Sequence, residues 1–154
     1  GEWVYEQHAL GFNYRISDVH AALGMSQMSK LDTFVKQRNE LRKVYDQAFS
    51  SLACTPLRMA DNITNSFHLY VILLDGKFDR LEIFEALRDK GLGVNVHYIP
   101  VYKQPYYQRL GFDQQYCDGA EIFYQHAITL PLFPCIDHVD LNEVISIVVQ
   151  TLSS

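Results

Sequence analysis

The sequence predicts a mixed α/β (α+β) domain in which a small sheet is covered by helices and a long helix comes first. Apolar residues recur at three- and four-residue intervals over residues 17–51, which is typical of a long amphipathic helix. After that helix, short apolar runs alternate with further helical patterns. The 154 residues are enough to bury the core of one ordinary domain. We therefore expect residues 1–154 to form a single domain.

The first helix is expected to begin at Ser17, whose hydroxyl can accept backbone N–H groups at a helix start. Gly24 is its weakest point, because glycine lowers helix stability. If the helix breaks there, Asp32 and Thr33 could cap a second half.

Two polar side chains, Asn13 and Arg15, stand just ahead of this helix in residues 11–18 (GFNYRISD). The N-terminal end of a helix dipole is positive and favours a phosphate. These residues are therefore candidates for an anion site. A capped helix after a solvated loop explains the same residues and is the commoner arrangement.

Residues 67–74 form a compact apolar run, which predicts a buried strand. Asp79 and Glu82 then resemble a capping box that opens a helix running to Gly91. In residues 94–99 the side chains alternate as in a second strand, which Pro100 ends.

The last third of the chain predicts a helix over residues 120–127 and a short strand over residues 128–132. Pro131 confines that strand to an edge or an end. Asp140 is expected to cap a final helix. The loops are expected over residues 59–66 and 102–119.

The composition argues against several classes of function. A net charge of −5, with no clustered Lys/Arg stripe, disfavours nucleic acid or an anionic membrane surface as the main partner. No apolar run approaches the length needed to cross a bilayer. The three cysteines and six histidines are scattered, so we expect neither a disulfide framework nor a metal site. These features favour the cytoplasm.

Several segments together resemble the DegT/DnrJ/EryC1/StrS family of pyridoxal-phosphate sugar aminotransferases. They are residues 11–18, residues 21–28 (AALGMSQM) with Leu31, residues 96–102 (VHYIPVY), Gly91, and residues 129–131 (TLP). The resemblance covers essentially the whole chain. Within the family, the chain is most similar to the members that act in pseudaminic acid biosynthesis.

The resemblance implies the C-terminal small domain of a fold-type I aminotransferase, with a small, mostly antiparallel sheet. In this family, the lysine that binds pyridoxal 5′-phosphate covalently lies in a large domain upstream of residues 11–18. We therefore expect no catalytic residue in this chain, and we expect the cofactor to be bound mainly by that missing domain. The lysines of the chain are expected to be solvated: Lys30, Lys36, Lys43, Lys77, Lys90 and Lys103.

The same resemblance implies roles for individual residues. Asn13 would reach across a dimer interface to the cofactor phosphate, and Arg15 would either help bind that phosphate or anchor the turn. His97 and Tyr98 would approach the sugar nucleotide. Strand alternation places these two on opposite faces, so both can contact one ligand only if the strand twists or ends there. We favour His97, whose face also carries Asn95, although a histidine bonded into the sheet surface is an equal alternative.

Two functions remain open. The first is part of a homodimeric transaminase that moves an amino group from an amino acid to C4 of a UDP-linked 4-keto-6-deoxy sugar, with this chain inactive alone. Separation from the large domain would then leave uncovered the first ten residues and the helix face that bears Val19, Leu23 and Met28. The second function is a free-standing ligand-binding or interaction domain with the same fold.

Overall fold

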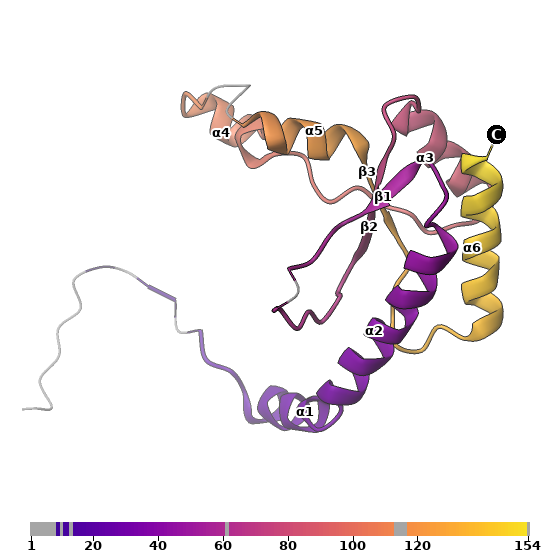
Figure 1. Ribbon diagram of the computed structural model, residues 1–154. Helices are drawn as coiled ribbons and strands as arrows, with labels where there is room; N and C mark the ends of the chain where they lie inside the picture. Colours follow the sequence, from indigo (N-terminus) through magenta and orange to yellow (C-terminus); the bar gives the residue numbers. More distant parts are fainter. Residues whose placement is uncertain (1–8, 10, 13, 61, 113–116, 154) are drawn as a thin grey trace, which may run out of the picture. The chain divides into compact units, whose positions relative to one another are not determined.

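The computed structural model describes residues 9, 11–12, 14–60, 62–112 and 117–153 (Figure 1). The chain divides into two compact units, Gly1–Asp32 and Thr33–Ser154, and each is described by itself. No helix in the described part of the chain combines the length and the apolar character needed to cross a membrane.

The expected first helix is divided into α1 (Asp18–Met28) and α2 (Leu31–Ala48). Ser17 caps α1, as predicted. The division falls at Ser29 and Lys30 and not at Gly24, which lies inside α1. The Ser29 hydroxyl donates to Ser26 O at 2.8 Å, and Lys30 N donates to Gln27 O at 3.0 Å. These local bonds replace the helical pattern and end α1.

The sheet belongs to the second unit and has the order β1 (Cys54–Pro56), β2 (Tyr70–Leu74) and β3 (Ala127–Leu130). Both pairs of strands are antiparallel, which confirms the expected sheet. Ile72 at the centre of β2 pairs with Pro56 on one side and with Ile128 on the other. β2 and β3 match the two apolar runs of the sequence, and Pro131 follows directly after the edge strand β3. β1 was not expected from the sequence.

The helices of the second unit begin at side-chain caps. Asp79 accepts hydrogen bonds from Leu81 N at 2.7 Å and Glu82 N at 3.1 Å, and α3 (Arg80–Asp89) follows. Gly91 ends this helix with a φ of +84°, a left-handed conformation that favours glycine.

α5 (Asp118–His126) agrees with the predicted helix. α6 (His138–Leu152) is capped by Asp137, and the expected cap Asp140 lies inside its first turn. The loop expected over residues 102–119 contains a 3₁₀ turn η1 (Val101–Lys103) and a short helix α4 (Pro105–Arg109). Pro105 has the fixed φ that suits the first position of a helix.

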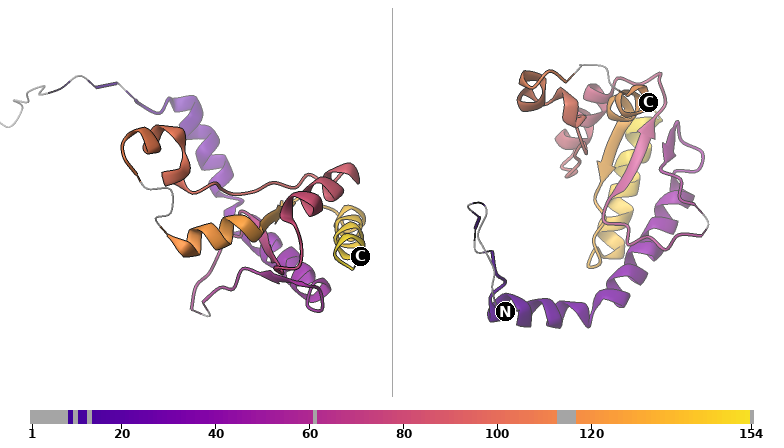
Figure 2. Two further views of the ribbon diagram at one scale, coloured as in Figure 1. Left: turned by 90° about the horizontal axis from the view of Figure 1, so that it is seen from above. Right: turned by 90° about the vertical axis from the view of Figure 1, so that its left-hand side faces the viewer.

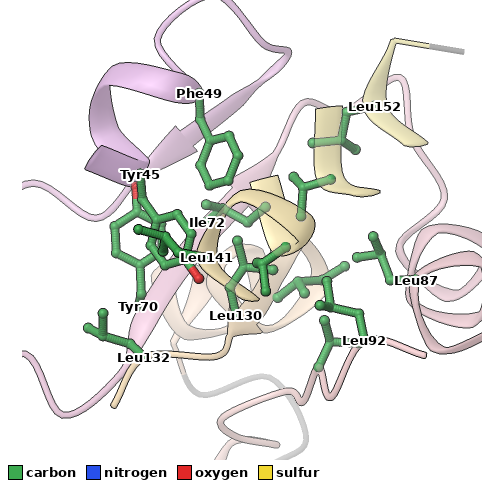
Figure 3. Packing of buried hydrophobic residues seen from close by; sticks show 14 of the residues in the cluster. Tyr45, Phe49, Tyr70, Ile72, Leu87, Leu92, Leu130, Leu132, Leu141 and Leu152 are labelled. Carbon is green, nitrogen blue, oxygen red and sulfur yellow. The ribbon is translucent and has the colours of Figure 1, made fainter. Parts of the chain in front are cut away.

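The core of the second unit lies between the sheet and the apolar faces of α2, α3 and α6 (Figure 3). In Figure 2, α6 runs alongside the sheet. Tyr45 and Phe49 of α2 stack with ring centroids 5.4 Å apart, and Tyr45 also contacts Tyr70 of β2. The Tyr45 hydroxyl donates to Pro131 O at 2.8 Å, so its polar end is satisfied inside the core.

Candidate functional site

The first candidate region is the turn that leads into α1. Ser17 Oγ accepts a hydrogen bond from His20 N at 3.4 Å and lies 2.7 Å from His20 Nδ1. Arg15 is exposed, whereas Asn13 lies outside the described residues. Asp18 places a negative charge in the first turn, where it interacts favourably with the helix dipole. This helix end therefore places an exposed arginine beside the backbone N–H groups of the first turn, and the charge of Asp18 would repel an anion there.

The large apolar side chains that the structure describes in the same unit are exposed. α1 buries none of its residues. Val19, Leu23 and Met28 are all exposed. Phe12 and Tyr14 stack on each other with ring centroids 5.2 Å apart, and both remain exposed.

The second candidate region is the segment over residues 94–99, which the sequence predicted to be a strand. This prediction is wrong, because only Asn95 pairs with the sheet, in an isolated bridge to Thr129. Asn95 N donates to Thr129 O at 3.1 Å and Thr129 N donates to Asn95 O at 2.8 Å. Asn95 Oδ1 then accepts a hydrogen bond from Val96 N at 2.8 Å, so the next backbone N–H is bonded to the asparagine side chain. This local bond competes with continued strand pairing.

His97 and Tyr98 lie together where the pairing ends. Their rings meet edge to face with centroids 4.5 Å apart, so the expected opposite faces are not observed. The peptide bond between them is cis. His97 Nδ1 lies 2.8 Å from Thr129 Oγ1, which ties the imidazole to β3. The Tyr98 side chain is 70% exposed. The histidine is thus bonded to the sheet, as in the alternative interpretation, and it also contacts an exposed aromatic ring.

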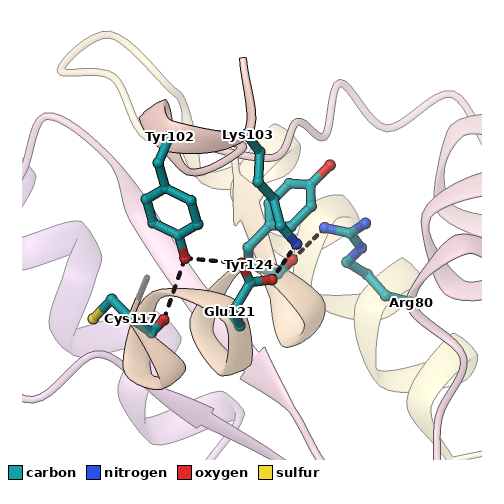
Figure 4. A network of polar contacts seen from close by, with 6 residues as sticks. All are labelled: Arg80, Tyr102, Lys103, Cys117, Glu121 and Tyr124. Carbon is teal, nitrogen blue, oxygen red and sulfur yellow. Dashed lines mark hydrogen bonds and ion pairs between the residues drawn. The ribbon is translucent and has the colours of Figure 1, made fainter. Parts of the chain in front are cut away.

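A buried carboxylate fixes the chain just after these residues (Figure 4). Glu121 of α5 is only 8% exposed. Its Oε1 accepts a hydrogen bond from the Tyr102 hydroxyl at 2.8 Å, and its Oε2 forms an ion pair with Lys103 Nζ. The Lys103 hydrogen bond lowers the pKa of Glu121, against an opposing effect of burial. Burial, followed by the hydrogen bond to Glu121, raises the pKa of Tyr102 to about 12. These shifts favour a charged Glu121 and a neutral Tyr102.

Sequence reasoning assigned no role at the site to Glu121, Thr129 or Lys103. The expected helix over residues 120–127 was based partly on Ile122, yet Ile122 is exposed and Glu121 is buried. The lysine of the buried pair lies 18 residues away from Glu121. A local pattern therefore contains no signal for this pair.

The lysines differ in their surroundings. Lys103 was expected to be solvated, but its side chain is 29% exposed and paired with Glu121. Lys90 Nζ donates to Thr151 Oγ1 at 2.9 Å. In the part of the chain that the structure describes, no three His, Cys, Asp or Glu side chains gather as metal ligands would. Cys54, Cys117 and Cys135 are all free thiols.

Comparison with known proteins gives consistent results for sequence and structure. The model of the DegT/DnrJ/EryC1/StrS aminotransferase family matches residues 2–149. UDP-4-amino-4,6-dideoxy-N-acetyl-beta-L-altrosamine transaminase from Campylobacter jejuni is 36% identical over 132 residues, which are 84% of this chain and 35% of that protein.

Solved structures share the fold over nearly the whole chain. Helicobacter pylori PseC, an aminotransferase involved in the biosynthesis of pseudoaminic acid, superposes with a TM-score of 0.87 at 31% identity, covering 98% of this chain and 41% of PseC. The PLP-form of Spr1654 from Streptococcus pneumoniae superposes with a TM-score of 0.85 at 26% identity, covering 97% of this chain and 40% of that one. The chain spans 35% to 41% of the length of the curated relatives that it matches.

Proposed function

Because this chain belongs to the DegT/DnrJ/EryC1/StrS aminotransferase family, we propose that it forms the C-terminal small domain of a pyridoxal-phosphate-dependent transaminase. The enzyme would transfer an amino group from an amino acid to C4 of a UDP-linked 4-keto-6-deoxy sugar, in pseudaminic acid biosynthesis. The observation that carries this proposal is the family match over residues 2–149, together with the similarity to PseC and to the altrosamine transaminase. Nothing in these comparisons favours the alternative of a free-standing binding domain.

The chain would contribute to cofactor binding through the turn before α1. Bound pyridoxal phosphate would supply the electrophilic carbon and the electron sink for amino-group transfer. The groups present suit its phosphate, because the exposed Arg15 and the first-turn amides of α1 are donors at the positive end of a helix dipole. Asn13 would add an amide donor. The covalent lysine and most of the cofactor contacts would come from a large domain that resembles those of the relatives.

His97 and Tyr98 would bind the sugar nucleotide. Since Thr129 Oγ1 engages Nδ1 of His97, a substrate hydroxyl would bind at Nε2. The exposed ring of Tyr98 meets the imidazole edge to face and would pack against the sugar. Because residues 97 and 98 do not continue in a strand, both side chains can contact one ligand.

The enzyme would act as a homodimer in the cytoplasm, with no nucleic acid or membrane partner. The exposed apolar residues of α1 suit a helix that is covered by other parts of a larger assembly.

The proposal is tested with two variants of the transaminase that contains this chain. His97→Ala should raise the apparent KM for the UDP-linked keto sugar with little change in cofactor binding, and His138→Ala is the matched exposed control. Asn13→Ala should weaken cofactor retention about ten- to a hundredfold, the effect of losing one hydrogen bond to a charged group. The opposite pattern, in which His97→Ala loses cofactor and Asn13→Ala retains it, would show that the two roles are assigned wrongly.

The chain alone should have no transaminase activity. It should also show no saturable, borohydride-trappable visible absorption band when mixed with pyridoxal phosphate, because the covalent lysine is expected in the large domain. Such a band assigned to one lysine would contradict the proposal that the covalent lysine lies in the large domain.

A further inference from the structure

Residues 97–103, here called the anchored segment, are held at both ends by one continuous part of the chain. At one end, His97 Nδ1 lies 2.8 Å from Thr129 Oγ1 of β3. At the other end, Tyr102 and Lys103 bind the carboxylate of Glu121 on α5. α5 ends at His126 and β3 begins at the next residue, so both anchors belong to a single helix–strand unit.

Most side chains in the middle of the anchored segment are exposed. Tyr98, Ile99 and Val101 are exposed, and Pro100 is buried. Backbone bonds inside the segment are short-range, from Lys103 N to Pro100 O at 2.9 Å and from Gln104 N to Val101 O at 3.0 Å. Because such bonds fix the turn but not its place on the sheet, the position of Tyr98 depends on the two anchors and on the buried Pro100 between them.

Glu121 is well suited to the second anchor. A carboxylate that is largely removed from water must be paired and hydrogen-bonded, and both oxygens of Glu121 are used by the anchored segment. The titratable side chains bound to it are Tyr102 and Lys103 from η1, and the Tyr102 hydroxyl also donates to Cys117 O at 3.3 Å. Arg80 of α3 lies close by, bonded to Tyr124 O with its guanidinium 4.6 Å from the Tyr124 ring centroid (Figure 4).

We propose that Glu121 is a positioning residue for the substrate-binding pair. By binding Tyr102 and Lys103, it fixes the far end of the anchored segment and so sets where the Tyr98 ring lies against His97. This inference rests on the proposed role of His97 and Tyr98 in sugar binding. Sequence patterns and the family comparisons assign no role to Glu121.

The test uses the 154-residue chain without a ligand. Backbone amide exchange is measured over residues 101–103, and the contact between the His97 and Tyr98 rings is followed by NMR, with Tyr98→Phe to assign the ring signals. Glu121→Ala should speed exchange in residues 101–103 about tenfold and weaken the ring contact, while exchange in β2 stays unchanged. Glu85→Ala, at an exposed glutamate of α3, is the matched control and should change nothing.

A pH profile separates positioning from a general structural role. The pKa of Glu121 lies below its usual range in the folded chain, so the pairing is complete at neutral pH and is lost as the pH falls through that lowered value. The His97–Tyr98 contact of the unaltered chain should therefore weaken in this acidic step. Glu121→Gln should remove the step, because the amide does not titrate.

If Glu121→Ala does not fold, variants of Lys103 provide a second test of the same pairing. Lys103→Met should loosen the anchored segment as Glu121→Ala does, and Lys103→Arg should restore it, because the guanidinium can bind the carboxylate. An unchanged ring contact in Glu121→Ala, or in Lys103→Met, would overturn the proposal. Because no ligand is used, this failure is distinct from a failure of the proposed function, which the kinetics of His97→Ala decide.

Discussion

The two units of the chain differ in the burial of their apolar residues. In the second unit, Tyr45 and Phe49 of α2 pack with Ile72 of β2 in a continuous core. In the first unit, Val19 and Leu23 of α1 follow the same helical spacing but remain exposed. A helical pattern of apolar residues therefore shows that a face needs a partner, and it does not show that the same chain supplies the partner.

The largest expected contrast is in stability. Leu87→Ala should lower the free energy of unfolding by about 2–5 kcal/mol, because Leu87 is fully buried in the core and its removal leaves a cavity. Leu23→Ala makes the same change at a side chain that is 58% exposed, and it should alter stability by no more than about 0.5 kcal/mol. Urea unfolding of both variants measures the difference. Equal losses would show that α1 is buried in solution and would remove the contrast between the units.

The next contrast is in thiol reactivity within the second unit. Burial raises the pKa of the Cys54 thiol to about 11, whereas Cys117 is exposed. Since the thiolate is the reactive form, Cys54 should be labelled by iodoacetamide about a hundredfold more slowly than Cys117 near pH 8. Its rate should rise about tenfold per pH unit until the pH approaches that pKa. Mass spectrometry of a labelling time course resolves the sites, and similar rates at both would mean that β1 opens readily.

A smaller contrast concerns self-association. The exposed face of α1 should drive the isolated chain into dimers or larger assemblies, so Leu23→Glu should weaken association about tenfold or more. Leu81→Glu is the matched control, because Leu81 lies on α3 and is 61% exposed but belongs to the unit with its own core. Light scattering over a concentration series gives both values. A strictly monomeric chain at high concentration would refute the idea that α1 lacks a partner.

The smallest contrast compares two helix caps. Asp79→Ala should cost about 1 kcal/mol of stability, because its carboxylate accepts two backbone N–H groups at the start of α3 and α3 packs into the core. Ser17→Ala removes the cap of α1, where no residue is buried, and should leave the cooperative unfolding transition unchanged while it reduces helical circular dichroism slightly. If Ser17→Ala shifts the unfolding midpoint as much as Asp79→Ala, then α1 folds together with the second unit.

The elements that the sequence identified correctly have local signals. The caps at Ser17 and Asp79 bind donors two or three residues ahead, and Gly91 ends α3 through its own backbone freedom. The apolar run of β2 also lies within a few residues. Such signals can be recognised from residue type and spacing alone.

The errors occur where a side chain competes with regular structure. Ser29 ends a helix that its apolar pattern would have continued. Asn95 pairs with the sheet in one isolated bridge, where the alternation predicted a strand. In both places a short polar side chain binds a backbone group nearby, which the apolar periodicity does not reveal.

By itself, the sequence determined the helices apart from α4, the turn η1 and the break between α1 and α2. It also determined two of the three strands, the family and the residues proposed to bind cofactor and sugar. Only the tertiary structure decided that His97 is bonded to Thr129, 32 residues away, and that Glu121 binds Lys103, 18 residues away. Caps and apolar spacing act within one or two helical turns, so they are visible in the sequence. Contacts between α5, β3 and residues 97–103 depend on the path of the whole chain. Burial strengthens the ion pair and the hydrogen bonds among them, because the local dielectric constant is lower than that of water.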